Sequence, residues 1–271
     1  MNHVNVSVIL PVFNPKNFED NIVRNIFEQS LPHFRVILIN DDHGPDAENL
    51  ISRLKAENNL REDKVKLILL KTEKRASGPA TARNMGLKEV KYGYLAFLDC
   101  DDRWHPEFLE VMSKTLFGSS SPFLLAGYSF KKQHKETKVI LPPTYGRNEL
   151  LQTNLLSMPC VMLNLNLLKL KMFPIIGHED YGFWLLNLGR DSSFSFVRRE
   201  LVVINKRAGS LSSDEKRSAN WHWRILKAEG LSPIATIVLF LTYVVNAVLK
   251  RREGIYRPLL LPKKVTKLLI L

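Results

Sequence analysis

The segment from Tyr94 to Asp102 constrains the fold more than any other part of the chain. It is an apolar run of strand character that ends in three carboxylates, those of Asp99, Asp101 and Asp102. Carboxylates this close repel one another, and burial would strengthen the repulsion, so they need a cation or a shared proton at neutral pH. Such oxygen ligands favour Mg²⁺ or Mn²⁺ over zinc. An acidic turn before a helix that starts near Pro106 is the alternative, because acidic residues are frequent at helix starts.

Residues 76–86, just before this run, read Ala-Ser-Gly-Pro-Ala-Thr-Ala-Arg-Asn-Met-Gly. The Gly-Pro pair predicts a turn and a helix from Pro79 to about Lys91. Free backbone N–H groups at its start attract anions, and the guanidinium of Arg83 suits phosphate. Together with the carboxylates, this pattern predicts a diphosphate ligand. A capped helix in which Arg83 pairs with an acidic neighbour is the alternative.

The first half of the chain alternates strand-like runs with helical segments, which predicts βαβ units and a mostly parallel sheet flanked by helices. Right-handed crossovers would bring the carboxyl ends of these strands to one edge of the sheet. The expected strands are 4–12, 34–40, 65–71 and 94–99, with helices at about 16–30, 45–60, 79–91 and 105–116. In the second half, we expect strands within 122–141 and at 158–163, 194–198 and 201–206, and helices at 147–153, 164–170 and 179–188.

Residues 231–249 form an uncharged apolar run, followed by Lys250-Arg251-Arg252. A membrane span needs about 20 apolar residues, and a run that is apolar nearly all round is not a simple solvated helix. A helix lying in the membrane interface, a true span, and a buried or homodimer-forming helix are all open. Trp221 and Trp223 just upstream fit an interfacial belt or ordinary packing.

The formal net charge of +12 is concentrated at the end of the chain. The last 22 residues hold seven basic residues and one acidic residue, a net charge of +6. These charges are interspersed with leucines, and aromatic residues are few. This pattern favours an anionic membrane surface over nucleic acid as the partner.

The composition suits a globular protein of a reducing compartment. A chain of 271 residues with 45% hydrophobic residues can form one large α/β domain plus an appendage. Two cysteines, Cys100 and Cys160, do not suggest a disulfide framework and fit a reducing cytosol. The apolar start at 4–13 lacks a basic leader and is interrupted by Pro11, so it is expected to be the first strand and not a signal peptide.

Five ordered motifs resemble the family 2 glycosyltransferases, which are inverting enzymes of GT-A fold that use sugar nucleotides. The resemblance covers roughly residues 4–215. Its motifs are Val-Ser-Val-Ile-Leu-Pro-Val-Phe-Asn at 6–14, Asn-Asp-Asp at 40–42, the Gly and Ala-Arg-Asn positions of 78–86, Phe-Leu-Asp-Cys-Asp-Asp at 97–102 with Trp104, and Glu-Asp at 179–180.

The resemblance implies roles for the acidic residues. Asp101 would be the direct ligand of Mn²⁺ or Mg²⁺, and Asp102 would belong to the same metal group. Asp99 would bind the donor sugar, the ribose, or the metal through water. Asp180 would be the general base, with a helix N-cap as its alternative role. Glu179 would orient the base or contact the acceptor.

Further residues are implied on the donor side. Arg83 would meet the donor diphosphate. Asp42 matches the carboxylate that accepts from the pyrimidine N–H, although a His-Gly pair at 43–44 replaces the common Gly-Ser and puts this contact in question. Pro11 and Asn14 would shape the nucleotide pocket through backbone groups. Arg207 lies in a basic loop and would contact the diphosphate, with a solvated turn as its alternative.

The implied function is transfer of one sugar, with inversion, from a nucleotide-diphosphate sugar to a hydroxyl of a glycan or lipid-linked acceptor. A UDP-sugar is the expected donor, and bacterial surface polysaccharide or lipopolysaccharide biosynthesis is the expected process. We expect a GT-A catalytic domain at 1–218. Residues 219–271 are expected to form an apolar helix and basic tail on the inner face of the cytoplasmic membrane.

Three other classes fit less well. A haloacid-dehalogenase phosphatase carries Asp-x-Asp after its first strand, with Thr or Val where Arg103 stands here. A nucleotidyltransferase needs a Gly-rich basic loop where residues 14–17 stand. A non-catalytic membrane scaffold explains the basic tail but not three acidic motifs at one sheet edge. Among the related enzymes, processive polysaccharide synthases carry several spans and a Gln-x-x-Arg-Trp motif, both absent from this sequence, so transfer of a single sugar is preferred.

Overall fold

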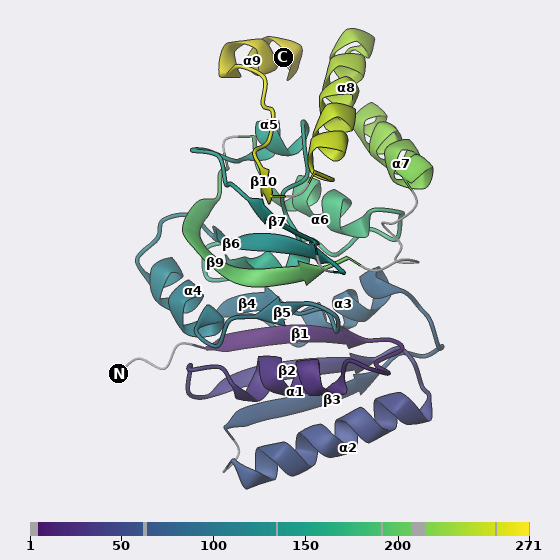
Figure 1. Cartoon of the computed structure of the whole chain (residues 1–271), viewed down its shortest axis with the longest axis vertical. Helices are drawn as coiled ribbons and strands as arrows, with labels where there is room; N and C mark the ends of the chain where they lie inside the picture. Colours follow the sequence, from purple (N-terminus) through teal and green to yellow (C-terminus); the bar gives the residue numbers. More distant parts are fainter. Residues whose placement is uncertain are drawn as a thin grey trace.

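The computed structural model describes residues 5–61, 64–133, 135–190, 192–206, 215–252 and 254–270. A central sheet runs through the molecule in the order β10-β7-β6-β8-β4-β1-β2-β3, with β9 beside β6 and β5 beside β9 (Figure 1). The strands are β1 (Val6–Val12), β2 (Phe34–Asn40), β3 (Val65–Lys71), β4 (Tyr94–Phe97), β5 (Arg103–Trp104), β6 (Phe123–Lys132), β7 (Lys135–Val139), β8 (Val161–Asn164), β9 (Ser195–Asn205) and β10 (Gly254–Tyr256).

The N-terminal half has the parallel arrangement that the alternating pattern predicts. The neighbouring strands β4, β1, β2 and β3 all pair in parallel. Buried Val, Ile and Leu side chains fill β1 and β2, as is typical of strands covered on both faces. The helices that connect or follow these strands are α1 (Glu19–Phe27), α2 (Pro45–Leu60), α3 (Pro79–Lys88) and α4 (Phe108–Phe117). The carboxyl ends of the parallel strands therefore meet at one edge.

The second half of the sheet is mixed. Strand β8 is antiparallel to both β4 and β6, whereas β9 is parallel to β6. The prediction of two strands at 194–198 and 201–206 was wrong, because β9 is continuous. A β-bulge in β9 opposite Gly127 accommodates the polar Arg-Arg-Glu stretch at 198–200 without ending the strand. The two backbones are close at this point, because a Cβ on Gly127 would lie only 2.6 Å from the backbone oxygen of Arg199.

The helix expected at 164–170 is also absent, and this segment of the described chain forms turns instead. The side chain of Asn164 accepts a hydrogen bond from the backbone N–H of Asn166 at 3.1 Å. The backbone N–H of Leu165 donates to the carbonyl of Gly93 at 2.8 Å. Asparagine side chains that bond to nearby backbone compete with helix formation, which explains the difference.

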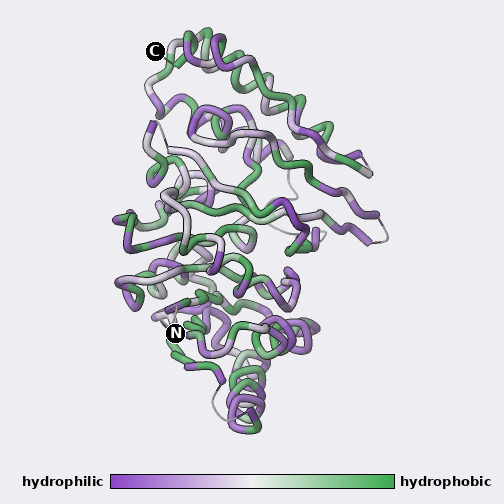
Figure 2. Tube along the Cα trace, turned by 90° about the vertical axis from the view of Figure 1, so that its left-hand side faces the viewer, coloured by the Kyte–Doolittle hydropathy of each residue, from purple (hydrophilic) through white to green (hydrophobic). Residues whose placement is uncertain are grey.

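The C-terminal segment packs onto the rest of the chain, where β10 joins the central sheet. After α5 (Arg147–Leu150), the 3₁₀ turn η1 (Met158–Cys160) and α6 (Glu179–Asn187), the chain forms α7 (Glu215–Ala228), α8 (Pro233–Leu249) and α9 (Lys263–Ile270). Strand β10 extends the sheet by pairing with β7. No helix in the described residues is both long and apolar enough to cross a membrane. At the end of the molecule where the C-terminus lies, hydrophobic and hydrophilic stretches of the chain lie side by side (Figure 2).

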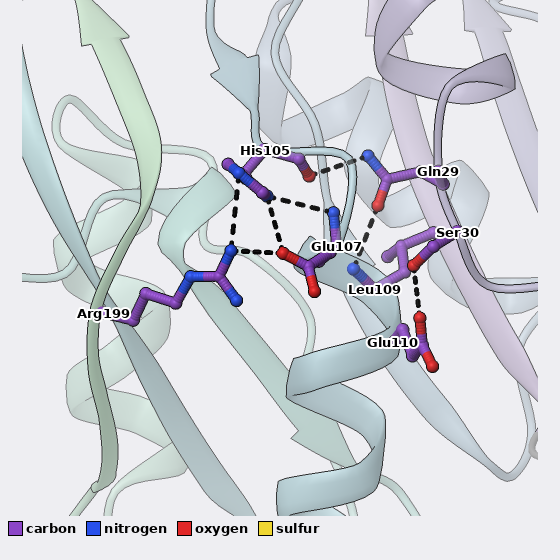
Figure 3. Close-up of polar contacts among 7 residues, drawn as sticks. All are labelled: Gln29, Ser30, His105, Glu107, Leu109, Glu110 and Arg199. Carbon is purple, nitrogen blue, oxygen red and sulfur yellow. Dashed lines mark hydrogen bonds and ion pairs between the residues drawn. The ribbon is translucent and has the colours of Figure 1, made fainter.

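The segment that follows the acidic motif is fixed between α1 and β9 (Figure 3). The side chain of Gln29 donates to the carbonyl of His105 at 3.2 Å and accepts from the N–H of Leu109 at 3.0 Å. From the other side, Arg199 of β9 pairs with Glu107. These contacts hold the start of α4, and thereby the end of the acidic loop, in one place.

Candidate active site

Adjacent aspartates after β2 have different surroundings. The carboxylate of Asp41 is buried and accepts hydrogen bonds from the hydroxyl of Thr72 at 2.8 Å and from the N–H groups of Ser77 and Gly78 at 2.9 and 3.0 Å. It therefore fixes the loop that leads into α3. Asp42 accepts from the guanidinium of Arg75 at 2.8 and 3.0 Å. Asp41 is thus a structural residue, and Asp42 is the one that faces a charged partner.

Arg75 was not identified from the sequence. Its guanidinium also donates to the backbone carbonyl of Asp42 at 2.7 Å and lies 5.5 Å from the ring centroid of Phe13. The Arg75 side chain is 64% exposed, so the contact leaves most of it open to solvent. Arg75, Asp42 and Phe13 come from the loops after β3, β2 and β1, which makes this cluster a product of the converging strand ends.

The acidic loop after β4 is held from α1. The side-chain amides of Asn21 and Asn25 donate to the backbone carbonyl of Asp102 at 2.8 and 2.7 Å. Asn25 also accepts from the N–H of Trp104 at 2.9 Å. No motif indicated these asparagines beforehand. They determine the path of the backbone between Asp99 and Trp104.

The three carboxylates of this loop do not converge. Asp102 is buried, and its carboxylate accepts from the backbone N–H of Asn205 in β9 at 2.9 Å. In the described residues, no three His, Cys, Asp or Glu side chains are placed to hold a metal ion. Asp99 and Asp101 are only partly buried. A pair of carboxylates still fits Mg²⁺ or Mn²⁺, since such ions are commonly held by one or two carboxylates together with substrate phosphates.

Arg83 lies at the centre of the site and joins its two sides. One terminal nitrogen donates to Asp99 at 2.8 Å and the other donates to Glu179 at 3.0 Å. The Arg83 side chain is only 6% exposed. Burial alone would lower the pKa of Arg83, but Asp99 and Glu179 raise it above its ordinary value. The guanidinium is therefore charged and bonded to two carboxylates. This pairing of Arg83 with acidic residues is the alternative that the sequence analysis left open. Contact of Arg83 with the donor diphosphate stays a prediction.

The next residue, Asn84, fixes the segment that precedes α6. Its side chain donates to the carbonyl of Phe173 at 2.9 Å and accepts from the N–H of Phe173 at 2.7 Å. The ring of Phe173 in turn lies 5.6 Å from the guanidinium of Arg83. The Ala-Arg-Asn motif of α3 thus places the start of α6 relative to the acidic loop.

The start of α6 carries the expected general base. His178 is the N-cap, with a left-handed φ of 58°, and the carboxylate of Asp180 accepts from the N–H of Tyr181 at 2.7 Å. Burial and the adjacent Asp180 raise the pKa of Glu179, and Arg83 opposes this shift. Glu179 is bonded to Arg83, whereas Asp180 has no ion-pair partner among the described residues. The two acidic residues therefore differ in that Glu179 is held by Arg83 and Asp180 is not; the role of Asp180 as general base stays a prediction.

Helix α7 packs against the residues just before Asp180, and α8 packs on α7. The rings of His178 and Trp221 meet at 5.3 Å, and a Cβ on Gly177 would lie 2.0 Å from the Trp221 ring, so only glycine fits there. His222 stacks on Tyr243 of α8 with ring centroids 3.7 Å apart. Burial, with a smaller effect of His178, lowers the pKa of His222 to about 3, so its ring is neutral.

The remaining expected donor residues lie at the same sheet edge or outside the described residues. Pro11 is in β1, and its carbonyl accepts from the Cys100 thiol at 3.2 Å. Asn14 follows β1 with a positive φ of 48°. Arg207 lies outside the described residues. The structure therefore brings Pro11, Asn14 and the acidic residues to one edge.

The family model described as "Glycosyl transferase family 2" matches residues 7–120. An uncharacterized glycosyltransferase of Haemophilus influenzae is 29% identical over 261 residues, covering 93% of this chain and 100% of the relative. The Escherichia coli enzyme WfgD is 25% identical over 248 residues, covering 90% of this chain and 94% of the relative. TuaG of Bacillus subtilis, a putative teichuronic acid biosynthesis glycosyltransferase, is 25% identical over 251 residues, covering 91% of this chain and 97% of the relative.

Solved structures show the same fold. TarS residues 1–349 from S. aureus, in complex with UDP-GlcNAc, superimpose with a TM-score of 0.63 at 18% identity, covering 89% of this chain and 71% of TarS 1–349. The mannosyltransferase PcManGT of Pyrobaculum calidifontis, in complex with GDP-Man and Mn²⁺, superimposes with a TM-score of 0.59 at 16% identity. The match covers 88% of this chain and 68% of the PcManGT chain. The chain thus has a fold like that of GT-A glycosyltransferases, matches the family 2 glycosyltransferase model over residues 7–120, and is similar along most of its length to glycosyltransferases that include enzymes named for bacterial polysaccharide biosynthesis.

Proposed function

We propose that this glycosyltransferase moves one sugar, with inversion, from a UDP-sugar to a hydroxyl of a lipid-linked or glycan acceptor at a membrane surface. The observation that carries the proposal is the Arg83 bridge between Asp99 and Glu179. It links the acidic loop expected to hold the donor to the helix that carries Asp180. An inverting transfer needs this arrangement, because the leaving group and the base must be aligned in one reaction.

On the donor side, Asp101 would hold a divalent ion together with Asp99, and Asp102 would keep the loop in position through Asn205. The ion, when bound, would neutralise charge on the leaving diphosphate. Asp42 would accept from the nucleotide base, which requires the exposed Arg75 side chain to move or to share the contact. Pro11, Asn14 and Arg207 remain proposed donor contacts.

On the acceptor side, Asp180 would take the proton of the attacking hydroxyl. Its neighbour Glu179 is bonded to Arg83 and so would hold the start of α6 in place. The relative WfgD is named as a glucosyltransferase acting on α-D-GlcNAc-diphosphoundecaprenol with a UDP-glucose donor. A lipid diphosphate acceptor and a place on the inner face of the cytoplasmic membrane are therefore proposed here as well.

The surface of α8 supports the membrane proposal. Its buried side packs on α7 and the rest of the protein, while the opposite side is apolar and exposed. The exposed residues follow helical spacing, and they are Ile234, Ile237, Leu241, Val244, Val245 and Val248. Exposed basic residues of the α8–α9 connection and of α9 lie nearby in the chain. An apolar helix face next to basic residues is typical of binding to anionic lipid.

We predict that donor binding depends on a divalent ion held at Asp101. Calorimetry should show that Asp101→Asn loses most UDP affinity in Mn²⁺, because diphosphate then meets the loop without charge compensation. The control is Asp20→Asn, which removes an exposed carboxylate of α1 that pairs with Arg53 of α2. This variant should bind UDP as the wild type does. Equal UDP affinity of the wild type in Mn²⁺ and in EDTA would refute the metal requirement.

We predict that Asp180→Asn leaves donor affinity nearly unchanged and lowers turnover by about 10²–10⁴-fold, the usual contribution of a general base. The measurement is single-sugar transfer to a short lipid-diphosphate acceptor, followed with a radiolabelled UDP-sugar, with the matched Asp20→Asn protein as the control. Near-normal turnover of Asp180→Asn would show that another group, with Glu179 the first to test, accepts the proton.

We predict that the full chain floats with vesicles containing anionic lipid, and that added salt weakens the binding without abolishing it. Each basic residue near such a surface contributes about 1 kcal/mol. Leu241→Glu should release the protein, whereas Leu60→Glu, at an 80% exposed leucine that ends α2, should not. A wild-type protein that stays off anionic vesicles at low salt, or a Leu241→Glu protein that still floats, would refute docking through α8.

A further inference from the structure

Two lysines from distant parts of the chain meet at one aromatic ring beside the active site. The ammonium of Lys206, just after β9, lies 4.0 Å from the ring centroid of Phe130. The ammonium of Lys250, at the C-cap of α8, lies 4.5 Å from the same centroid. Phe130 is buried in β6, so the ring position is fixed. Two cations are thereby held close together by the fold.

Neither lysine has a carboxylate partner among the residues that the structure describes. Lys250 donates to the backbone carbonyl of Asn154 at 3.2 Å, which is the hydrogen bond that the structure gives its ammonium. An ammonium group can donate three hydrogen bonds. Lys132 and Arg251 add further positive charge around Lys206. The ammonium groups of Lys206 and Lys250 therefore lie in a region of concentrated positive charge, and neither is paired with a carboxylate of the described residues.

Holding these charges together is costly without an anion. Burial, followed by the charge of Lys206, lowers the pKa of Lys250 to about 7. Burial and the neighbouring Arg251 and Lys132 lower the pKa of Lys206. An anion placed between the two would favour the protonated forms and satisfy their free hydrogen-bond donors.

The cluster lies on the side of the expected general base. Asp180 and Cys160 are near enough to Lys250 to raise its pKa, against the larger effect of burial. Lys250 also ends α8, the helix whose exposed apolar face is proposed to meet the membrane. A ligand bound here would have its anionic group on the side of Asp180 and its remaining part near α8.

We propose that Lys206 and Lys250, placed around Phe130, form a diphosphate-binding site next to Asp180. The inference rests on the proposed function, which supplies two molecules of this chemistry. One is the lipid-linked diphosphate acceptor, and the other is the nucleotide diphosphate of the donor. Either would be bound through charge-assisted hydrogen bonds from the two ammonium groups.

The test uses the full chain and calorimetric titration with inorganic pyrophosphate in the absence of metal. Lys206→Met and Lys250→Met should each weaken pyrophosphate binding by about tenfold or more, since hydrogen bonds to charged groups contribute at this level. Lys91→Met, at an exposed lysine between α3 and β4, is the matched control and should bind as the wild type does. Lys206 is the more exposed of the two lysines, so its variant remains informative even if Lys250→Met fails to fold.

Two further titrations distinguish the sources of the diphosphate. A loss confined to farnesyl diphosphate assigns the site to the acceptor, whereas a loss confined to UDP with Mn²⁺ assigns it to the donor. Pyrophosphate affinities of Lys206→Met and Lys250→Met that match the wild type would overturn the site. These binding measurements need no catalysis, so a wild-type protein that binds pyrophosphate through both lysines but transfers no sugar would refute only the proposed function.

Discussion

The ion pairs of Arg83 are the interaction on which the rest of the site depends. A guanidinium presents its donors in a rigid planar fork, so one side chain can hold two carboxylates in a fixed relation. Here it holds Asp99 at the end of the parallel sheet and Glu179 at the start of α6. Removing one partner from such a buried set leaves a charge uncompensated, which is typically destabilising by about 3–5 kcal/mol. The bridge therefore couples the position of the acidic loop, proposed to hold the donor, to that of the helix that carries the proposed base.

The C-terminal segment is built into this arrangement. The division expected between residues 218 and 219 stays a prediction, but β10 pairs with β7 and Trp221 of α7 packs over Gly177. Lys250 reaches the carbonyl of Asn154 from the end of α8. A helix with an exposed apolar face is thereby fixed close to Asp180. In the proposed function, the same segment meets the membrane and completes the site where a membrane-bound acceptor would react.

Local patterns predicted the parts of the fold that depend on local rules. The predictions of the parallel strands and of α2 were correct because apolar runs and turn residues mark these elements directly in the sequence. The prediction that the strand ends converge followed from the handedness of the crossovers. The contacts that set the site could not be predicted, since Asn25 reaches Asp102, and Arg75 reaches Asp42, only after the chain has folded. The position of the buried Asp102 carboxylate likewise depends on Asn205, 103 residues further along the chain.

The most direct measurement is a double-mutant cycle on kcat/KM for sugar transfer, using Arg83→Lys, Glu179→Gln and the combined variant. Lysine keeps the charge but loses the fork, so it cannot hold Asp99 and Glu179 together. If Arg83 acts through Glu179, Arg83→Lys should lower kcat/KM by about tenfold or more, and the combined variant should lose little beyond the larger single loss. Losses that multiply independently, or an Arg83→Lys enzyme as active as the wild type, would contradict the account.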